Sequence, residues 1–196
     1  HHRSSAASDV YKRQDRNSAE GHSNNQIVIR DASAEDALAI MHIWNANISS
    51  TLNTFNSRIK TEAEIKDTIL KTNKKNYGFF VSEREGSIIG FATYFQFRTG
   101  VGYVKTLEHT IVISDHMQRY GVGKALMGRL LEDAKRKNFQ SIFAGVSGSN
   151  ERAVNFHASL GFQVVAELPR VGYKFDKWLD LILMQKFLQT DQRNNS

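Results

Sequence analysis

The sequence lacks cysteine and any long hydrophobic run. Without cysteine the chain can form no disulfide, no thiolate metal site and no covalent cysteine intermediate. Its longest apolar stretches fall far short of the roughly 20 residues that a membrane span needs. Residues 1–26 also lack the apolar segment of a secretory signal. These absences predict a cytoplasmic protein with no membrane partner.

The composition indicates one globular domain with a basic surface. Of the 196 residues, 40% are hydrophobic and 23% are charged. A chain of this length and composition can fill one hydrophobic core but is too short for two large domains. Residues 1–26 are polar and aperiodic, so we expect a disordered or non-native leader there, a domain over 27–188 and a tail over 189–196. The net charge is +6, and removing the four basic and three acidic residues of the leader leaves +5. A basic domain favours anionic partners, either nucleic acid or a phosphorylated cofactor.

Strand and helix patterns alternate through the expected domain. Ser33 is placed to cap the first helix, and Thr61 with Glu64 forms a capping box at the start of the second. Helices are expected over 33–50, 61–75, 122–137 and 150–160, and strands over 27–31, as a pair within 78–97 around Glu85 and Gly86, and over 103–113, 141–147, 162–168 and 178–187. The expected buried faces are Ile65, Ile69 and Leu70 on the second helix, and Val122, Ala125, Leu126, Leu130, Leu131 and Ala134 on the third.

Two glycines lie where a strand passes into a helix, in the stretch HMQRYGVGKAL. A helix N-terminus presents unpaired N–H groups and partial positive charge, and glycine lets a phosphate approach the backbone. Arg119 and Lys124 add charge beside Gly121 and Gly123. The stretch fits neither the P-loop, which needs Ser or Thr after the lysine, nor the dinucleotide fingerprint, which needs a third glycine where this chain has leucine. The residues therefore indicate a pyrophosphate loop of another kind.

These residues resemble the GNAT superfamily of acyl-CoA-dependent N-acetyltransferases. Its pyrophosphate loop reads Q/R-x-x-G-x-G/A, which the stretch 118–123 matches, and 150–162 is similar to its N-x-x-A…LGF helix. The stretches TLEHTIVI, NFHASLGF and VGYKFDKWLDLILMQ resemble the phosphinothricin and methionine-sulfone acetyltransferase branch. The resemblance covers 27–188. It implies an α/β fold: a mixed, mostly antiparallel sheet of about seven strands with about four helices, splayed at the acetyl-CoA site.

The resemblance also implies which residues bind acetyl-CoA, the co-substrate. The edge of the strand would pair with the pantetheine amides as a β-strand does, and the glycine loop would hold the pyrophosphate. Asn150 would bond the pantetheine arm, although it is equally suited to cap the following helix. The implied cofactor-binding residues are Ile111, Val112, Ile113, Arg119, Tyr120, Gly121, Val122, Gly123, Lys124 and Asn150.

Two residues are candidates for proton transfer. An amine attacks a thioester only as the free base, and an α-amino group has a pKa near 8, so a base must remove its proton. By resemblance Glu108 is that base, acting through water, and the alternative is a solvated strand carboxylate. His157 stands where most of the family has a tyrosine that protonates the departing thiolate. Its alternative is a histidine packed beneath the sheet.

The expected substrate is a small amino acid or its analogue, acetylated on the α-amino group by direct transfer, since no cysteine can carry an acyl group. Phe55, Arg98, Lys174 and Trp178 resemble positions around the amino-acid pocket, but Gly100 replaces an expected second basic residue. We expect no metal, because His109 and His116 have no third ligand at useful spacing. Relatives in this branch are commonly dimers, so a homodimer is expected.

Three functions stay open on the sequence. The leading one is amino-acid N-acetylation, with a polyamine, a peptide or a protein lysine as the alternative amine. A non-catalytic acyl-CoA sensor would keep the cofactor loop but would not need Glu108 and His157. A nucleic-acid binder would need an interleaved basic and aromatic stripe, which the sequence does not contain, so no nucleic-acid partner is expected.

Overall fold

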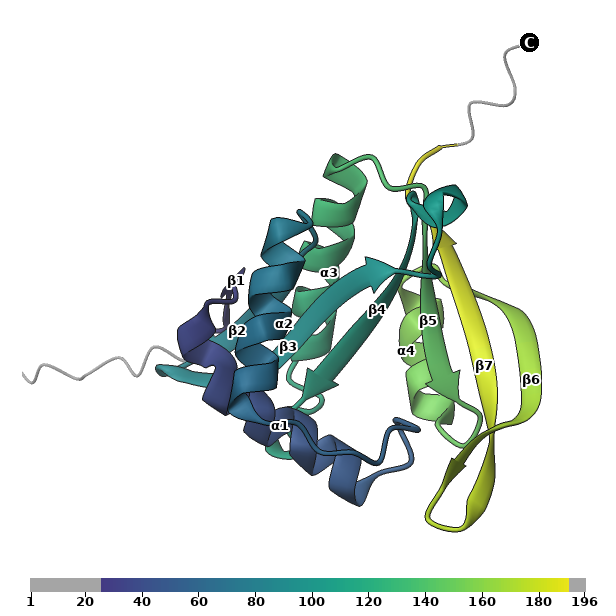
Figure 1. Cartoon of the computed structure of the whole chain (residues 1–196), viewed down its shortest axis with the longest axis horizontal. Helices are drawn as coiled ribbons and strands as arrows, with labels where there is room; N and C mark the ends of the chain where they lie inside the picture. The colour runs from purple at the N-terminus through teal and green to yellow at the C-terminus, as the bar shows by residue number, and fades with distance from the viewer. Residues whose placement is uncertain (1–25, 191–196) are drawn as a thin grey trace, which may run out of the picture.

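The computed structural model describes residues 26–190, which form one seven-stranded sheet with helices on both faces (Figure 1). The strand order is β1-β2-β3-β4-β5-β7-β6, and every pair is antiparallel except β4 with β5. The strands are β1 Val28–Asp31, β2 Phe79–Arg84, β3 Ser87–Gln96, β4 Thr106–Ile113, β5 Ser141–Ser147, β6 Gln163–Lys174 and β7 Lys177–Phe187. The helices are α1 Ala37–Ser50, α2 Glu62–Lys74, α3 Val122–Arg136 and α4 Glu151–Ser159.

Strand alternation divides the core into two layers. Side chains at successive strand positions point to opposite faces. Phe79 and Val81 of β2 therefore pack in a cluster with Ile40 of α1 and Ile65 of α2, whereas Phe80 between them packs on the opposite face. The sheet consequently has a helical layer of α1 and α2 on one face, and of α3 and α4 on the other (Figure 1).

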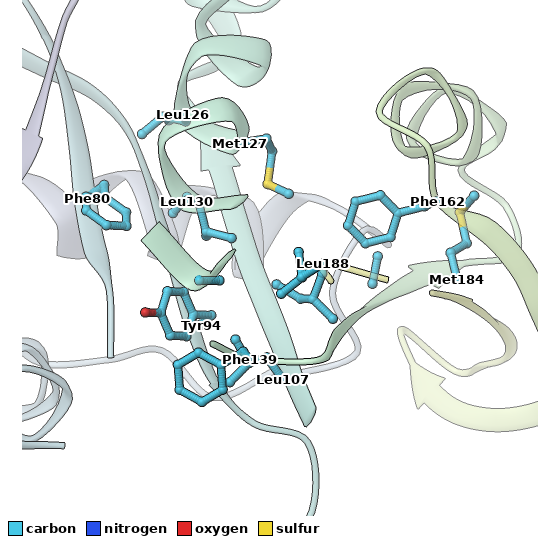
Figure 2. Close-up of a cluster of buried hydrophobic side chains, with 14 of the residues drawn as sticks. Phe80, Tyr94, Leu107, Leu126, Met127, Leu130, Phe139, Phe162, Met184 and Leu188 are labelled. Carbon is cyan, nitrogen blue, oxygen red and sulfur yellow. The ribbon is translucent and has the colours of Figure 1, made fainter. Parts of the chain in front are cut away.

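The larger cluster lies beneath α3 and continues to the second half of the sheet. Figure 2 shows Leu126, Met127 and Leu130 of α3 above Tyr94 and the neighbouring core residues, with Phe162 and Met184 farther along. All of these side chains are buried. Because one continuous cluster spans both halves of the sheet, it fixes β4 relative to β5 at the end where these strands pair.

A buried carboxylate braces α3 against this core. Tyr94 Oη donates to Asp133 Oδ2 at 2.7 Å, and Lys137 Nζ lies 2.8 Å from the same oxygen. Arg136 Nη2 donates to Asp133 Oδ1 at 2.8 Å. Burial opposes ionisation of Asp133, but the hydrogen bonds from Lys137 and Tyr94 outweigh that effect and lower its pKa.

The seven strands, the four helices and the capping box of Thr61 with Glu64 confirm the predicted fold. The predicted strand 103–113 begins later, because Val101–Tyr103 forms a 3-10 turn, and β6 runs beyond residue 168 to Lys174. Leu70 and Ala125 lie at the edges of their helical faces and are exposed, which corrects the two predicted stripes. Residues 1–25 and 191–196 lie outside the described residues, so the leader, the domain limits and the tail stay predictions.

None of the helices within 26–190 is long and apolar enough to cross a membrane.

Candidate active site

The site begins where two parallel strands separate. β4 and β5 pair only at Thr106 with Ser141, Leu107 with Ile142 and Glu108 with Phe143. Beyond Glu108 the two strands diverge, as Figure 1 shows. The opening is a cleft of about 840 Å³, lined by both strands, by the start of α3, by α4 and by the segment that joins α1 to α2. The sheet is therefore splayed, in agreement with the fold expectation.

Glu108 lies at the narrow end of this cleft, on the last β4 residue that pairs with β5. Its Oε1 is 3.3 Å from the position that a Cβ on Gly145 of β5 would occupy. Burial raises the pKa of Glu108, and the positive charge of Arg98 partly offsets that effect. A half-buried carboxylate of raised pKa that faces a cleft suits a general base better than a solvated strand residue.

The exposed strand edge continues from Glu108 to the end of β4. Residues 109–113 pair with β3 on one side, from Tyr94 to Gly90, and β5 does not pair with them on the other. Ile111, Val112 and Ile113 all line the cleft. Backbone groups that point toward the cleft are thus free for an extended, amide-containing ligand, as in the addition of a strand to a sheet edge.

The glycine loop supplies free amides at the other end of the cleft. Arg119 and Gly121 have left-handed conformations, with φ of 73° and 77°. The first intrahelical bond of α3 runs from Ala125 N to Gly121 O, so the N–H groups of residues 122–124 have no partner within the helix. The loop therefore forms a cradle for an anion at a helix N-terminus.

Within this loop the residues divide between the cleft and the core. Arg119, Gly121, Gly123 and Lys124 line the cleft. Tyr120 is exposed and Val122 is buried in the core beneath α3, so the cleft lining does not include their side chains. A Cβ on Gly123 would lie 3.2 Å from Cζ of Phe156, so glycine at this position lets α3 approach α4 closely.

Asn150 has two hydrogen-bond partners at the start of α4. Its Oδ1 accepts from Ala153 N at 3.0 Å, which makes it the N-cap. Its Nδ2 donates to Asn53 Oδ1 at 2.8 Å, which links α4 to the segment after α1. Both asparagines line the cleft.

His157 is buried and is paired with a second buried histidine, His109 of β4. His157 Nδ1 lies 2.7 Å from Ala153 O and must donate, because a carbonyl oxygen only accepts. In the neutral ring Nε2 is then the acceptor, and it receives a hydrogen bond from His109 Nε2 at 3.2 Å. His109 Nδ1 has no partner among the described residues.

This arrangement keeps both rings neutral. Burial, and then the neighbouring His157, lower the pKa of His109 to about 3. Burial also lowers the pKa of His157, although the bond to Ala153 O opposes it. Both rings line the cleft, but both nitrogens of His157 have hydrogen-bond partners, which favours the packed histidine over a free acid at this position.

The predicted substrate residues separate into two groups. Phe55 lines the cleft, where its ring packs on Gly172 of β6. Arg98 is exposed and outside the lining, although it is close enough to lower the pKa of Glu108. Trp178 is exposed on the β6-β7 hairpin beside Tyr173, also outside the lining.

The expectation for Lys174 as a substrate donor needs correction. Lys174 is buried, and its Nζ donates to Thr51 O at 2.7 Å and to Thr54 O at 2.9 Å. An ammonium that has these partners within its own chain is not presented to a ligand. Within the described part of the chain no group of three His, Asp or Glu side chains could hold a metal ion, and His116 is exposed in a 3-10 turn.

Several residues that line the cleft were not predicted from the sequence, among them His109 and Asn53. The sequence suggests His109 only as a metal ligand, and nothing local in it joins His109 to His157, 48 positions away. Asn53 follows α1 in a polar stretch with no motif, so no signal singled it out. The pair of Arg152 Nη1 with Gln118 Oε1, 2.9 Å apart, also joins α4 to the glycine loop.

Amides without a helical partner lie at one end of the cleft and the half-buried Glu108 lies at the other, an arrangement that suits a phosphate-bearing ligand with a proton acceptor beside it. Residues 29–183 match the acetyltransferase (GNAT) domain family. The chain therefore belongs to the GNAT family, and it is an N-acetyltransferase.

Three relatives describe this similarity further. An L-methionine sulfoximine/L-methionine sulfone acetyltransferase of Salmonella typhimurium is 33% identical over 166 residues, covering 85% of this chain and 96% of its own. An acetyltransferase from the same organism, solved with its cofactor acetyl-CoA, superposes with a TM-score of 0.83 at 32% identity, over 86% and 97% of the two chains. A phosphinothricin acetyltransferase of Sinorhizobium meliloti in complex with acetyl-CoA gives 0.82 at 26% identity, over 86% and 92%.

Proposed function

We propose that this enzyme transfers an acetyl group from acetyl-CoA to the α-amino group of a small L-amino acid or analogue, of the methionine sulfone, methionine sulfoximine or phosphinothricin type. The observation that carries the proposal is the half-buried Glu108 at the narrow end of a cleft whose other end offers free helix amides. The relatives named for these substrates support the choice of amine.

Acetyl-CoA supplies the acetyl group as an activated thioester. The amides of Val122, Gly123 and Lys124, with the side chains of Arg119 and Lys124, would hold the pyrophosphate, while Tyr120 would shield it from solvent. The free edge of Ile111, Val112 and Ile113 would align the pantetheine amides. Asn150 would have to exchange its bond with Asn53 to reach that arm, because its Oδ1 already caps α4.

Glu108 would take the proton from the substrate ammonium, directly or through one water, and release the free amine. Its raised pKa brings it nearer to that of the amine, which favours proton transfer. The reaction needs no acyl-enzyme, because the chain has no cysteine and Glu108 faces the same cleft as the donor loop. His157 would hold the wall beside the thioester; a role as proton donor would require its imidazolium form, which burial opposes.

The substrate pocket would lie beside Glu108, with Phe55 as its apolar wall and Arg98 as its cation for the carboxylate. Gly100 supplies no second cation, and the ammonium of Lys174 is bonded to its own chain. We therefore expect weaker recognition of the doubly anionic phosphinothricin than of methionine sulfone or sulfoximine, whose side chains are neutral.

We also propose a cytoplasmic homodimer. The β6-β7 hairpin carries exposed Val171, Tyr173, Phe175 and Trp178, an apolar surface typical of a protein contact. Trp178 would then act through the subunit contact. Sedimentation equilibrium should give twice the chain mass, and a monomer at working concentration would contradict this part of the proposal.

A substrate screen tests the proposed function. Amino acids, methionine sulfone, methionine sulfoximine, phosphinothricin, polyamines and peptides are each incubated with acetyl-CoA, and thiol release is followed. The proposal requires the highest kcat/KM for a neutral-side-chain amino acid. A preference for polyamines or peptides would replace the substrate class, and absence of thiol release with every amine would favour an acyl-CoA sensor.

A further inference from the structure

One wall of the cleft is a segment without helix or strand, residues 51–61, which joins α1 to α2. Four consecutive residues of this segment, 53–56, line the cleft, and Phe55 is among them. At its far end, Asn45 of α1 bonds both the N–H and the C=O of Lys60 at 2.8 Å. A wall of this kind keeps its shape only where other elements hold its backbone.

Lys174 at the end of β6 holds the near end of this segment. The residue as a whole is 2% exposed, and its Nζ donates to the carbonyl oxygens of Thr51 and Thr54. No described carboxylate lies within ion-pair distance of Nζ. A buried ammonium is costly unless hydrogen bonds compensate it, and here the compensating groups are the backbone carbonyls on either side of Asn53.

Gly172, two residues earlier, holds the aromatic part of the same wall. A Cβ on Gly172 would lie 2.4 Å from Cδ2 of Phe55, so the ring packs directly on the backbone of β6. Residues two apart in a strand point to the same face. Gly172 and Lys174 therefore contact the segment from one side of one strand.

The hairpin reaches this wall because it is longer than the rest of the sheet. β5 pairs with β7 no farther than Ser147 with Leu181, whereas β6 continues with β7 through Gly172 with Leu179 to Lys174 with Lys177. In Figure 1 the hairpin extends past β5 on the side where the chain leaves α1.

We propose that Lys174 and Gly172 are positioning residues for the amino-acid half of the site, which they control by holding residues 51–55 in place. Neither touches the substrate. Lys174 fixes the backbone on both sides of Asn53, and Gly172 gives Phe55 its place against β6. The inference rests on the proposed function, because it assigns this wall to the amino acid and not to acetyl-CoA.

The first test replaces Lys174 with methionine, which keeps length and burial and removes the donors. Lys177→Met on the same hairpin is the control, because Lys177 is exposed. The KM for L-methionine sulfone should rise at least about tenfold in Lys174→Met, the equivalent of losing about one hydrogen bond to a charged group. The acetyl-CoA KM and both values in the control should stay within about twofold, since these residues do not line the donor end. An equal rise of both KM values in Lys174→Met would overturn the proposal.

The second test needs no catalytic activity. Trypsin cleavage after the exposed Arg58, followed by mass spectrometry, reports whether the segment opens. Cleavage should be several-fold faster in Lys174→Met than in wild type or Lys177→Met. Gly172→Ala, which displaces Phe55, should also accelerate it. An unchanged cleavage rate in both variants would overturn the positioning proposal, even if the enzyme acetylates another amine. Faster cleavage without any amino-acid acetylation would reject only the proposed function.

Discussion

Replacing Glu108 with glutamine removes the carboxylate at the narrow end of the cleft and keeps its shape. The Oε1 atom of Glu108 lies only 3.3 Å from the position that a Cβ on Gly145 would occupy, so there is little free space around the side chain. The isosteric amide of glutamine therefore disturbs the two strands least. A positioned base contributes about 10²–10⁴-fold to the rate. At about 1.36 kcal/mol per decade this is about 2.7–5.4 kcal/mol of activation free energy. We expect kcat/KM for L-methionine sulfone to fall by that factor at pH 7.

The pH profile separates loss of a base from general damage. The variant should recover part of its rate above pH about 8, where the free α-amine is abundant. In wild type the acid limb of kcat/KM reports Glu108, whose pKa is raised by burial and partly restored by Arg98. Arg98→Ala should therefore move this limb to higher pH as well as raise the KM for the amino acid. Initial rates of thiol release from pH 5 to 10 measure both effects.

Stability provides the control for this experiment. Because the folded-state pKa of Glu108 is raised, its ionised form weakens the fold at neutral pH, and this cost disappears as pH falls below the ordinary carboxyl pKa of about 4.3. Glu108→Gln should thus be at least as stable as wild type at pH 7. Activity within a few-fold of wild type would refute the role of Glu108, and a large fall in Tm would refute the electrostatic reasoning.

Gly121→Val forces a branched residue into a left-handed conformation that costs about 1–2 kcal/mol, so calorimetry should show weakened acetyl-CoA binding. The control is Gly128→Ala, at an exposed site on the same helix. Equal affinities of the two variants for acetyl-CoA would contradict the loop assignment. Nitrogen NMR at pH 7 should show His157 protonated only at Nδ1 and His109 only at Nε2, because burial lowers both pKa values. An imidazolium signal from either ring at this pH would exclude the neutral pair. Asp133→Asn should lower the free energy of unfolding by about 1–3 kcal/mol at pH 7. Since the pKa of Asp133 is lowered in the fold, the difference from wild type should shrink as pH falls below about 4. A difference that stays constant in urea melts along a falling pH series would contradict this electrostatic account.

The local parts of this structure could be predicted from the sequence because their causes are local. Thr61 and Glu64 lie one turn apart, and their reciprocal bonds follow from that spacing. Gly121 precedes α3 for the same kind of reason: a left-handed residue is needed where the chain enters the helix. The glycine pattern alone therefore predicts an anion-binding loop at this position.

Contacts between distant residues could not be predicted in this way. The hydrogen bond between His109 and His157 depends on how α4 packs against β4. Hydrophobic periodicity predicts each element but not how the two elements pack together. Lys174 reaches carbonyl groups more than 100 residues away in the sequence only because β6 extends beyond the rest of the sheet. The strand predicted over 162–168 is shorter than β6, so the sequence pattern does not predict this contact. The same limit explains Leu70, which the helical pattern places on the apolar face of α2 but which is exposed in the tertiary structure.

The most direct test of the account is whether the wild-type enzyme converts L-methionine sulfone and acetyl-CoA to the N-acetyl amino acid, identified by mass spectrometry and by the shift of its α-proton in NMR. We predict one acetylated product per thiol released, with the acetyl group on the α-nitrogen. Thiol release without that product, or acetylation of a polyamine or peptide in its place, would contradict the claim that the cleft between β4 and β5 acts on a small amino acid.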